Sequence, residues 1–358
     1  MEAVNNKYLK ILVTGASGFI GRKLCFALAE MGYEVVALCR NINHPFLIQH
    51  RNIQFVKGDV LEIESLNKAM KGCYQVYHTA AMAKMWCKNE QDFYDVNVIG
   101  TRNVLACALK SEVERVVHTS TCGVWGPTLN FPVSENDPRA VGFPISYERT
   151  KYLAELEVKN FVKKGLDVVI VNPSRVYGDG PITDSNTVSK MVRGYLKGTW
   201  YFIPGDGEAI ANYAFVDDVV QGHISAMQHG RNGERYILGG EDVSFNGFFN
   251  TLKAITGKNR KLYKVPVSII KAYSMLEFVK TKLFNLTPFF LPEFADRLKC
   301  NQQYCSSKAI NELNYSITPF IKGLSKTVNH FKNYHVKHPF KNWRKRGFRQ
   351  IVRHRNGK

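Results

Sequence analysis

Short apolar runs alternate with amphipathic segments along the first half of the chain, and this alternation restricts the fold more than any other feature of the sequence. The runs are rich in β-branched residues, as in KILVTG and DVVIVNP, which is typical of strands buried on both faces. The segments between them have apolar residues at helical spacing and are long enough for right-handed crossovers. The pattern predicts a doubly wound parallel α/β sheet, with strands at 10–15, 34–40, 53–59, 75–80, 115–120 and 167–173 and helices at 22–31, 64–71, 96–110 and 146–163.

Three glycines stand between the first predicted strand and the first predicted helix, in the stretch ILVTGASGFIG. In this context Gly15 permits a tight turn, Gly18 lets the backbone approach a pyrophosphate, and Gly21 lets the helix lie close to the strand. The N-terminus of the helix then faces the negative charge of the ligand. The spacing predicts the dinucleotide-binding loop of a Rossmann-type domain, and a glycine-rich turn without a ligand is the competing interpretation.

The residues that end the second and third predicted strands bear on the choice of cofactor. NAD-preferring proteins usually carry a carboxylate at the end of the second strand, whereas this chain has Arg40 there. A guanidinium accepts the 2′-phosphate of NADP, so the sequence favours NADPH over NADH, and an exposed arginine without a ligand is the alternative. Asp59 ends the third strand, where it either accepts a hydrogen bond from adenine or caps the next helix.

After Tyr177 the pattern becomes irregular, with Gly- and Pro-rich turns and helical stretches at 187–196, 218–228, 245–255 and 267–284. We expect a Rossmann-type NAD(P)-binding domain over 8–180, to which a strand and a helix near 210–240 return, a smaller substrate-binding domain over 181–330 and a basic tail over 331–358. The sequence has no secretory signal pattern and no run of about 18 uncharged apolar residues, so we expect a cytoplasmic protein. Its eight cysteines lack the spacing of a metal site, and we expect no metal.

Tyr147 and Lys151 form a Tyr-x-x-x-Lys pair inside a predicted helix, in the stretch SYERTK. Residues four apart share one face of a helix, so we expect the ammonium beside the phenol, where it would lower the pKa of the phenol toward neutral pH. Tyr147 would then exchange a proton with a carbonyl or alcohol oxygen. Thr119, Ser120 and Thr121 end the fifth strand, where a hydroxyl can donate to the same oxygen. Each pattern also occurs without function in exposed helices and strand ends, but together they predict a proton-transfer site.

These stretches, together with GDV, HTAA, NVIGTRNVL and NPSRVYG, resemble the extended short-chain dehydrogenase/reductase family, also called the NAD-dependent epimerase/dehydratase family, over about residues 10–315. Within that family the chain looks most like the dihydroflavonol-reductase-like group. The resemblance implies a catalytic triad in which Tyr147 and Lys151 are joined by Thr121, or less favourably Ser120, while Asn97 braces the neighbouring helix. The motifs and the resemblance together give these candidate cofactor contacts: Gly15, Ser17, Gly18, Phe19, Ile20, Gly21, Arg40, Asp59, Val60, Ala80, Ala81, Thr119, Tyr147, Lys151, Pro173, Ser174 and Val176.

Aromatic and methionine residues follow several predicted strands, where open α/β sheets bind their substrates. They suggest a pocket for a hydrophobic ketone, aldehyde or alcohol, although packing between two domains places the same residue types there. The candidate pocket residues are Met82, Met85, Trp86, Trp125, Phe143 and Tyr177. The sequence therefore favours an NADPH- or NADH-dependent oxidoreductase that acts on a hydrophobic small molecule.

Two other functions compete with this interpretation. Sugar-nucleotide epimerases and dehydratases of the same family commonly carry a charged pair ahead of the VDD element, but this chain has Ala211 and Asn212 there, which puts the usual diphosphate clamp in doubt. A redox-inert dinucleotide-binding protein would usually lose the tyrosine or the lysine, and both are present. We therefore place the epimerase second and the inert protein third.

Twelve basic residues and no acidic residue follow Glu312, so most of the net charge of +19 lies near the C-terminus. After Pro339, aromatic residues recur at roughly helical spacing among Lys and Arg; they are Phe340, Trp343 and Phe348. Such a segment is suited to an anionic membrane surface, and the alternatives are a solvated tail or a helix packed on the enzyme; nucleic-acid binding is less favoured. A homodimer through helices 96–110 and 146–163 is common in the family, and nothing in the sequence tests it.

Overall fold

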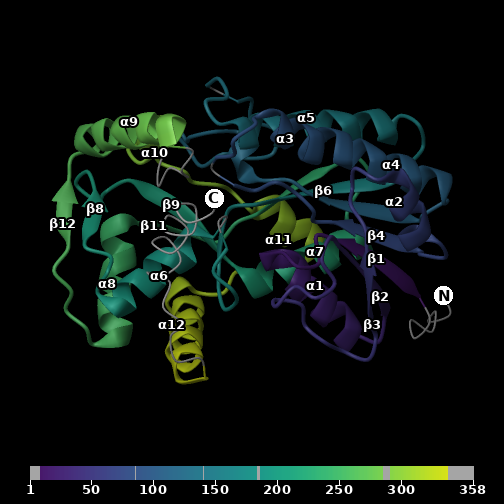
Figure 1. Cartoon of the computed structure of the whole chain (residues 1–358), viewed down its shortest axis with the longest axis horizontal. Coiled ribbons are helices and arrows are strands. Elements are labelled where there is room, and N and C mark those ends of the chain that lie inside the picture. Colours follow the sequence, from purple (N-terminus) through teal and green to yellow (C-terminus); the bar gives the residue numbers. More distant parts are fainter. Residues whose placement is uncertain (1–8, 85, 140, 184–185, 285–290, 338–358) are drawn as a thin grey trace, which may run out of the picture.

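The structure, a computed structural model, describes residues 9–84, 86–139, 141–183, 186–284 and 291–337. A seven-stranded parallel sheet forms the centre of the molecule, in the order β10-β6-β5-β4-β1-β2-β3 (Figure 1). Six of its strands are the apolar runs of the first half of the chain: β1 (Lys10–Thr14), β2 (Glu34–Cys39), β3 (Ile53–Lys57), β4 (Gln75–His78), β5 (Arg115–Thr119) and β6 (Val168–Pro173). The doubly wound parallel sheet predicted from the sequence is confirmed.

Helices cover both faces of this sheet (Figure 1). One layer contains α1 (Phe19–Glu30) and α7 (Val216–His229), and the other contains α2 (Ile63–Met70), α4 (Gly100–Lys110) and α5 (Ser146–Val162). Successive strand residues enter opposite layers, since Ile11 and Val13 pack in the core of α1 and α7 whereas Leu12 packs in the core of α2, α4 and α5. Side chains on a strand alternate in direction, so burial on both faces makes each run apolar throughout.

One predicted helix differs in detail from the structure. The sequence pattern predicts a single helix over 96–110, whereas the chain forms α3 (Gln91–Tyr94), a π-helix over Asp95–Ile99 and then α4 without a break. Single π-helical turns inside longer helices often occur at functional sites. This one holds Asn97, which is fully buried.

The chain leaves the sheet after β6 and later returns to it. β10 (Arg235–Leu238) pairs in parallel with β6 and forms one edge of the sheet. The helix before it, α7, packs against α1, β5 and β6. The first unit is therefore assembled from separate stretches of the chain, the last of which is α11 (Ser307–Leu313).

The second unit consists of two small sheets with helices around them. β7 (Arg175–Tyr177), β9 (Ile210–Phe215) and β11 (Glu241–Ser244) form one sheet, and β8 (Phe202–Pro204) pairs with β12 (Tyr263–Val265). The helices of this unit are α6 (Thr187–Lys197), α8 (Phe245–Thr256), α9 (Val267–Phe284), α10 (Pro292–Arg297) and α12 (Phe320–Lys337), whereas α11 (Ser307–Leu313) packs on α7 and β10. The core is aromatic, with Tyr213, Phe248 and Phe320 in contact with one another.

The C-terminal boundary differs from the expected one. The sequence predicts a tail from residue 331, but α12 continues to Lys337, and Phe331 is only 3% exposed because it packs in the aromatic core. The basic segment with Pro339, Phe340, Trp343 and Phe348 lies outside the described residues. Within the described ranges, no helix is long and apolar enough to cross a membrane.

Candidate active site

Close backbone contacts surround the glycines of the first loop. Gly15 has a φ of 70°, in the left-handed region, and a Cβ there would lie 2.7 Å from the backbone nitrogen of Ala80. A Cβ at Gly21 would overlap the carbonyl oxygen of Gly15 and lie 2.7 Å from Thr79 Oγ1. Helix α1 begins after Gly18, and no side chain caps its first turn. Its free N–H groups and the tight loop fit the pyrophosphate of a dinucleotide.

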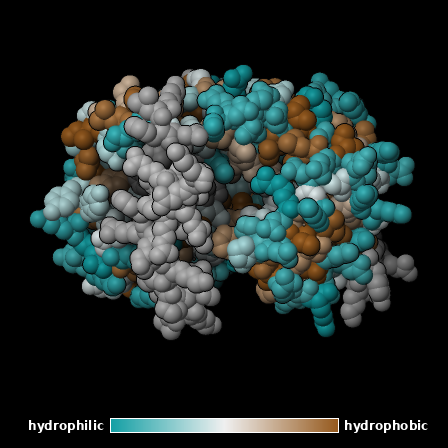
Figure 2. All heavy atoms as spheres, in the orientation of Figure 1, coloured by the Kyte–Doolittle hydropathy of each residue, from teal (hydrophilic) through white to brown (hydrophobic). Residues whose placement is uncertain are grey.

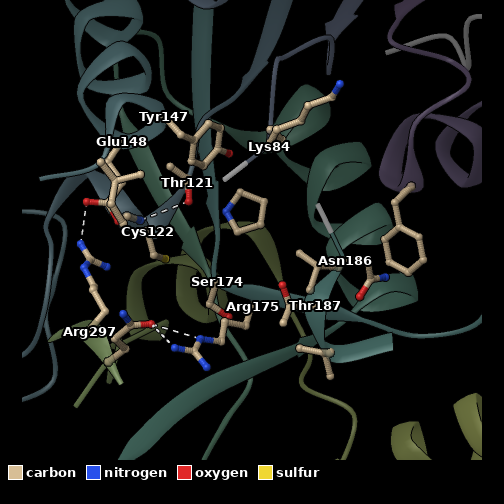
Figure 3. Close-up of a pocket in the computed structure, with 18 of the residues that line it drawn as sticks. Lys84, Thr121, Cys122, Tyr147, Glu148, Ser174, Arg175, Asn186, Thr187 and Arg297 are labelled. Carbon is tan, nitrogen blue, oxygen red and sulfur yellow. Dashed lines mark hydrogen bonds and ion pairs between the residues drawn. The ribbon is translucent and has the colours of Figure 1, made fainter. Parts of the chain in front are cut away.

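The loop opens into a cavity of about 390 Å³ between the carboxyl ends of the central strands and the second unit (Figure 3). Four groups of candidate cofactor contacts line it: Gly18, Phe19, Ile20 and Gly21 from the loop and the start of α1, Ala81 after β4, Thr119 and Tyr147 from β5 and α5, and Pro173, Ser174 and Val176 from the end of β6 into β7. Gly15, Ser17 and Ala80 belong to the loop and its backbone support but do not line the cavity.

Three further candidate cofactor contacts follow β2 and β3, which end side by side with Cys39 opposite Lys57. Arg40 is exposed at this edge of the sheet. Asp59 accepts a hydrogen bond from the backbone N–H of Leu61 at 3.1 Å, and Val60 is buried. These residues lie outside the cavity wall, on the side of the loop where the second strand of a Rossmann-type fold meets the adenosine half of its ligand.

One of the three hydroxyl groups at the end of β5 faces the candidate tyrosine. Thr119 Oγ1 lies 2.8 Å from His223 Nε2, and Ser120 donates to the Glu155 carboxylate at 2.5 Å, so both are held by buried partners. Thr121 instead lies beside the phenol of Tyr147, whose pKa its hydroxyl lowers, and its oxygen accepts the backbone N–H of Gly123 at 3.1 Å (Figure 3). The structure therefore distinguishes Thr121 from its two neighbours by contact.

The electrostatics of Tyr147 differ from the expectation. Burial raises the pKa of Tyr147 to about 12, and the Thr121 hydroxyl offsets only part of this effect. The Lys151 ammonium does not pair with the phenol but lies 3.2 Å from His118 Nε2, below the cavity. At neutral pH the phenol is thus protonated and has the Thr121 hydroxyl beside it.

Lys151 occupies a buried polar environment that the sequence analysis did not identify. It is 1% exposed, and burial lowers its pKa to about 8, although the carboxylate of Glu155 one turn along the helix acts in the opposite direction. Glu155 also accepts hydrogen bonds from Ser120 and, at 2.8 Å, from Asn172. Lysine and glutamate therefore support the end of β5 from one face of α5.

A row of hydrogen bonds connects the end of β1 to Asn97. Thr101 Oγ1 donates its proton to the carbonyl oxygen of Asn97 at 2.7 Å. Because that proton is used, the hydroxyl oxygen must accept in its 3.0 Å contact with His78, and His78 Nε2 is the donor. His78 Nδ1 then accepts from Thr14 Oγ1 at 2.8 Å. Asn97 accepts the backbone N–H of Met82 at 2.8 Å and donates to Thr150 at 3.0 Å. Asn97 thus joins the segment after β4 to helix α5 beside the tyrosine.

The opposite wall of the cavity is cationic. Glu148 contacts two guanidinium groups, Arg139 at 3.0 Å and Arg297 at 2.6 Å, so this buried cluster has one more positive than negative charge. Arg175, from β7, donates to Gln302 at 3.0 and 3.1 Å, and both residues line the cavity (Figure 3). Arg297 and Glu148 come from distant parts of the sequence, so no local motif marks them.

The aromatic residues predicted for the pocket lie elsewhere. Trp125 is 2% exposed, with the guanidinium of Arg235 4.7 Å from its ring, and Tyr177 is fully buried in the core of the second unit. Phe143 packs under Arg139 at 3.9 Å. Met82 and Trp86 do not line the cavity, and Met85 lies outside the described residues. The segments that follow the strands direct these side chains into packed parts of the molecule instead of into the cavity. A position just after a strand was therefore not enough to identify the residues that line the cavity.

Other apolar side chains line the cavity, and most come from the second unit. They are Ile145, Val188, Met191, Trp200, Phe202, Phe245, Phe294 and Leu298. The cavity thus combines an apolar wall, a cationic wall and a phenol–hydroxyl pair. In the described part of the chain, no group of His, Cys, Asp and Glu is arranged to hold a metal ion.

Comparison with known proteins agrees with this arrangement. Residues 11–239 match the model of the "NAD dependent epimerase/dehydratase family". The chain is 33% identical to a Synechocystis protein that carries the name dihydroflavonol 4-reductase, over 90% of this chain and 94% of that protein. It is 30% identical to "Sterol demethylase protein B" of Methylococcus capsulatus, over 84% of this chain and 92% of that protein.

Among solved structures, the fold is similar to that of UDP-glucose 4-epimerase from Thermotoga maritima with UDP-glucose. The TM-score is 0.76 with 25% sequence identity, and the match covers 91% of this chain and 99% of the epimerase chain. The similarity therefore extends over both units rather than over the nucleotide-binding half alone.

Proposed function

Because the chain belongs to the NAD-dependent epimerase/dehydratase family, whose model matches residues 11–239, we propose that it is a hydride-transferring oxidoreductase for a hydrophobic ketone, aldehyde or the corresponding alcohol. The observation that carries the proposal is the contact between Thr121 and Tyr147 in a cavity that also contains the glycine loop. A proton donor and a nucleotide site therefore share one enclosed space.

The residues present fit a nicotinamide dinucleotide. The N-terminus of α1 with Gly18 would hold the pyrophosphate, and the backbone after β6 at Pro173, Ser174 and Val176 would lie along its nicotinamide half. When bound, the cofactor supplies or accepts the hydride. We propose NADPH rather than NADH because Arg40 stands at the end of β2, where a carboxylate would bind the ribose hydroxyl.

The proton chemistry belongs to Tyr147. Its pKa of about 12 keeps the phenol protonated at neutral pH, so it is ready to donate to a carbonyl oxygen as that oxygen gains negative charge. Thr121, which lies beside the phenol, would donate a second hydrogen bond to the same carbonyl oxygen. Lys151, one turn along α5, contacts His118 at 3.2 Å and would contribute a nearby positive charge rather than a direct contact with the phenol.

The apolar wall supports a hydrophobic substrate. Met191, Trp200, Phe245 and Phe294 offer area for an aromatic or alicyclic body, and two relatives carry the names dihydroflavonol 4-reductase and sterol demethylase protein B. A sugar-nucleotide epimerase is the second candidate, favoured by Arg175 and Arg297 on the cavity wall and by the solved epimerase with UDP-glucose. Glu148 engages Arg297, which leaves less of its charge for a diphosphate.

The test follows the absorbance of reduced nicotinamide during incubation with hydrophobic ketones, hydroxysteroids and UDP-sugars. Tyr147→Phe should lose at least about a hundredfold in rate with unchanged NADPH affinity, because it removes the proton but not the ring. Tyr152→Phe, on the exposed face of the same helix, is the matched control and should keep full rate. Turnover by Tyr147→Phe at the wild-type rate would refute the mechanism, and turnover of UDP-sugars alone would establish the second candidate.

The choice of cofactor has its own variant. Arg40→Asp should reverse the preference from NADPH to NADH, because a carboxylate accepts from the ribose hydroxyl and repels the 2′-phosphate. Equal affinities of wild type and variant for NADPH would show that Arg40 does not contact the cofactor.

A further inference from the structure

Helix α9 has an apolar face that no part of the described chain covers. Five large side chains along it are more than half exposed: Ile269 58%, Tyr273 54%, Met275 55%, Leu276 63% and Val279 54%. The opposite face holds the helix to the second unit through Val267, Ile270 and Ser274, which are buried. Figure 2 shows hydrophobic side chains gathered over this end of the molecule, where Figure 1 places α9. Contiguous apolar surface on this scale is typical of an interaction site.

The chain that forms this face is basic. Residues 261–284, which include β12 and α9, contain five Lys and one acidic residue, Glu277. This segment and the region after Glu312 together carry sixteen of the nineteen net positive charges. The positive charge is thus concentrated beside the exposed apolar face and in the C-terminal segment.

We propose that the exposed face of α9 docks on the surface of an anionic phospholipid membrane, with the helix lying in the interface. Apolar side chains on a helix flanked by Lys and Arg are the combination that binds such surfaces, because acyl chains accept the apolar groups and headgroups attract the cations. A second copy of the chain is a poorer partner for this face, since two like-charged surfaces would repel each other.

Two of the lysines on α9 are paired with carboxylates. Lys271 pairs with Asp296 of α10 at 2.7 Å and Lys280 with Glu277 at 3.5 Å. Lys261 and Tyr263, which is 52% exposed, continue the mixed apolar and basic surface onto β12, where the ammonium lies 5.2 Å from the ring centroid. The docking surface therefore consists of the exposed face of α9 and the neighbouring strand β12.

The position of α9 gives the docking a consequence for the cavity. The Lys271–Asp296 pair joins α9 to α10, and Phe294 of α10 lines the cavity with Leu298 just after it. A membrane on α9 would therefore lie next to the α10 wall of the cavity. Docking itself does not depend on the reaction proposed above, and its test uses no substrate.

The test is co-sedimentation of the full-length protein with phosphatidylcholine vesicles, with and without phosphatidylserine. Leu276→Glu/Val279→Glu should bind the phosphatidylserine vesicles at least about tenfold more weakly than wild type, because it removes two apolar anchors and adds negative charge. Met31→Glu/Ile63→Glu is the matched control: it introduces the same charge at two other exposed apolar positions, 45% and 53% exposed, in the first unit. The control should bind like wild type.

The C-terminal segment is the same in all these proteins, so a difference between them reports on α9. Thermal melting and NADPH titration establish that each variant is folded. Equal sedimentation of wild type and the α9 variant would overturn the proposal, as would wild-type binding that does not increase with phosphatidylserine. A wild-type dimer that the α9 variant converts to a monomer, seen by light scattering without lipid, would assign the face to a second copy instead.

Discussion

Replacing Lys151 by Met should make the protein more stable at neutral pH while it abolishes turnover. The folded protein holds the pKa of Lys151 at about 8, against an ordinary value of 10.5 in the unfolded chain. Below pH 8 both states are protonated, and the shift costs the folded state about 3 kcal/mol. Met fills a similar volume without charge, but it loses the hydrogen bond to His118, worth about 1 kcal/mol. The expected net gain in free energy of unfolding at pH 7 is therefore about 2 kcal/mol.

The sign of the pH dependence follows from the same pKa values. Between pH 8 and 10.5 the unfolded chain binds the proton and the folded chain has lost it, so wild-type stability rises with pH in this window through Lys151. The advantage of Lys151→Met should thus shrink from about 2 kcal/mol at pH 7 to near zero at pH 10. Urea unfolding followed by fluorescence at several pH values measures both quantities.

Lys159→Met is the matched control for this prediction, since Lys159 is exposed on the same helix. It should change the free energy of unfolding by less than about 0.5 kcal/mol and leave the rate intact. A Lys151→Met protein that is less stable than wild type at pH 7, or whose stability difference is constant up to pH 10, would refute the assigned electrostatics of Lys151.

Three further changes test other parts of the site. Gly21→Ala should weaken NADPH binding by at least about tenfold in a fluorescence titration because its Cβ would displace the glycine loop, whereas Gly142→Ala, which has open space around it, should not. Glu148→Gln should lower the free energy of unfolding, measured in urea, by about 3 kcal/mol because it leaves two buried guanidinium groups next to each other without a carboxylate. Glu157→Gln is the control: it removes a half-exposed ion pair with Arg102 and should cost less than about 1 kcal/mol. Burial lowers the pKa of His78 from 6.5 to about 3. On acidification the unfolded chain therefore binds this proton before the folded chain does. The free energy of unfolding should fall by about 2 kcal/mol between pH 6.5 and 5 through His78 alone. A His78→Asn variant should show a shallower loss over that range.

The central sheet was predictable because most of its early strands are buried on both faces and are therefore largely apolar, although β3 at the edge is only partly buried. Local spacing likewise gave the glycine loop and the helix with Tyr147 and Lys151. β10 was harder to identify, since Arg235–Leu238 is four residues long and lies far along the chain from β6. The π-helix at Asp95–Ile99 could not be recognised from the spacing of apolar residues. It adds one residue to one turn, which changes the helical spacing only locally.

The wall of the cavity shows where local reasoning fails. Trp125 and Tyr177 follow strands as a pocket residue would, yet Trp125 packs in a cluster with Ile237 and Tyr177 is buried in the core of the second unit. Arg297 reaches the site from α10 through a contact with Glu148, about 150 residues away, which no short motif records. Two signals were available in the sequence: histidines inside the otherwise apolar strands β4 and β5, and Glu155 four residues after Lys151 on the same helical face.

The route of the chain between the two units limits how they can move. The backbone crosses from the sheet into β7, returns through α7 and β10, leaves again into β11, comes back to α11 and ends in α12. A single proteolytic cut after residue 180 would not free either half, because the fragment that follows still carries an edge strand of the sheet. Any opening of the cavity must bend several connections at once, which favours a small rotation over a wide separation of the halves.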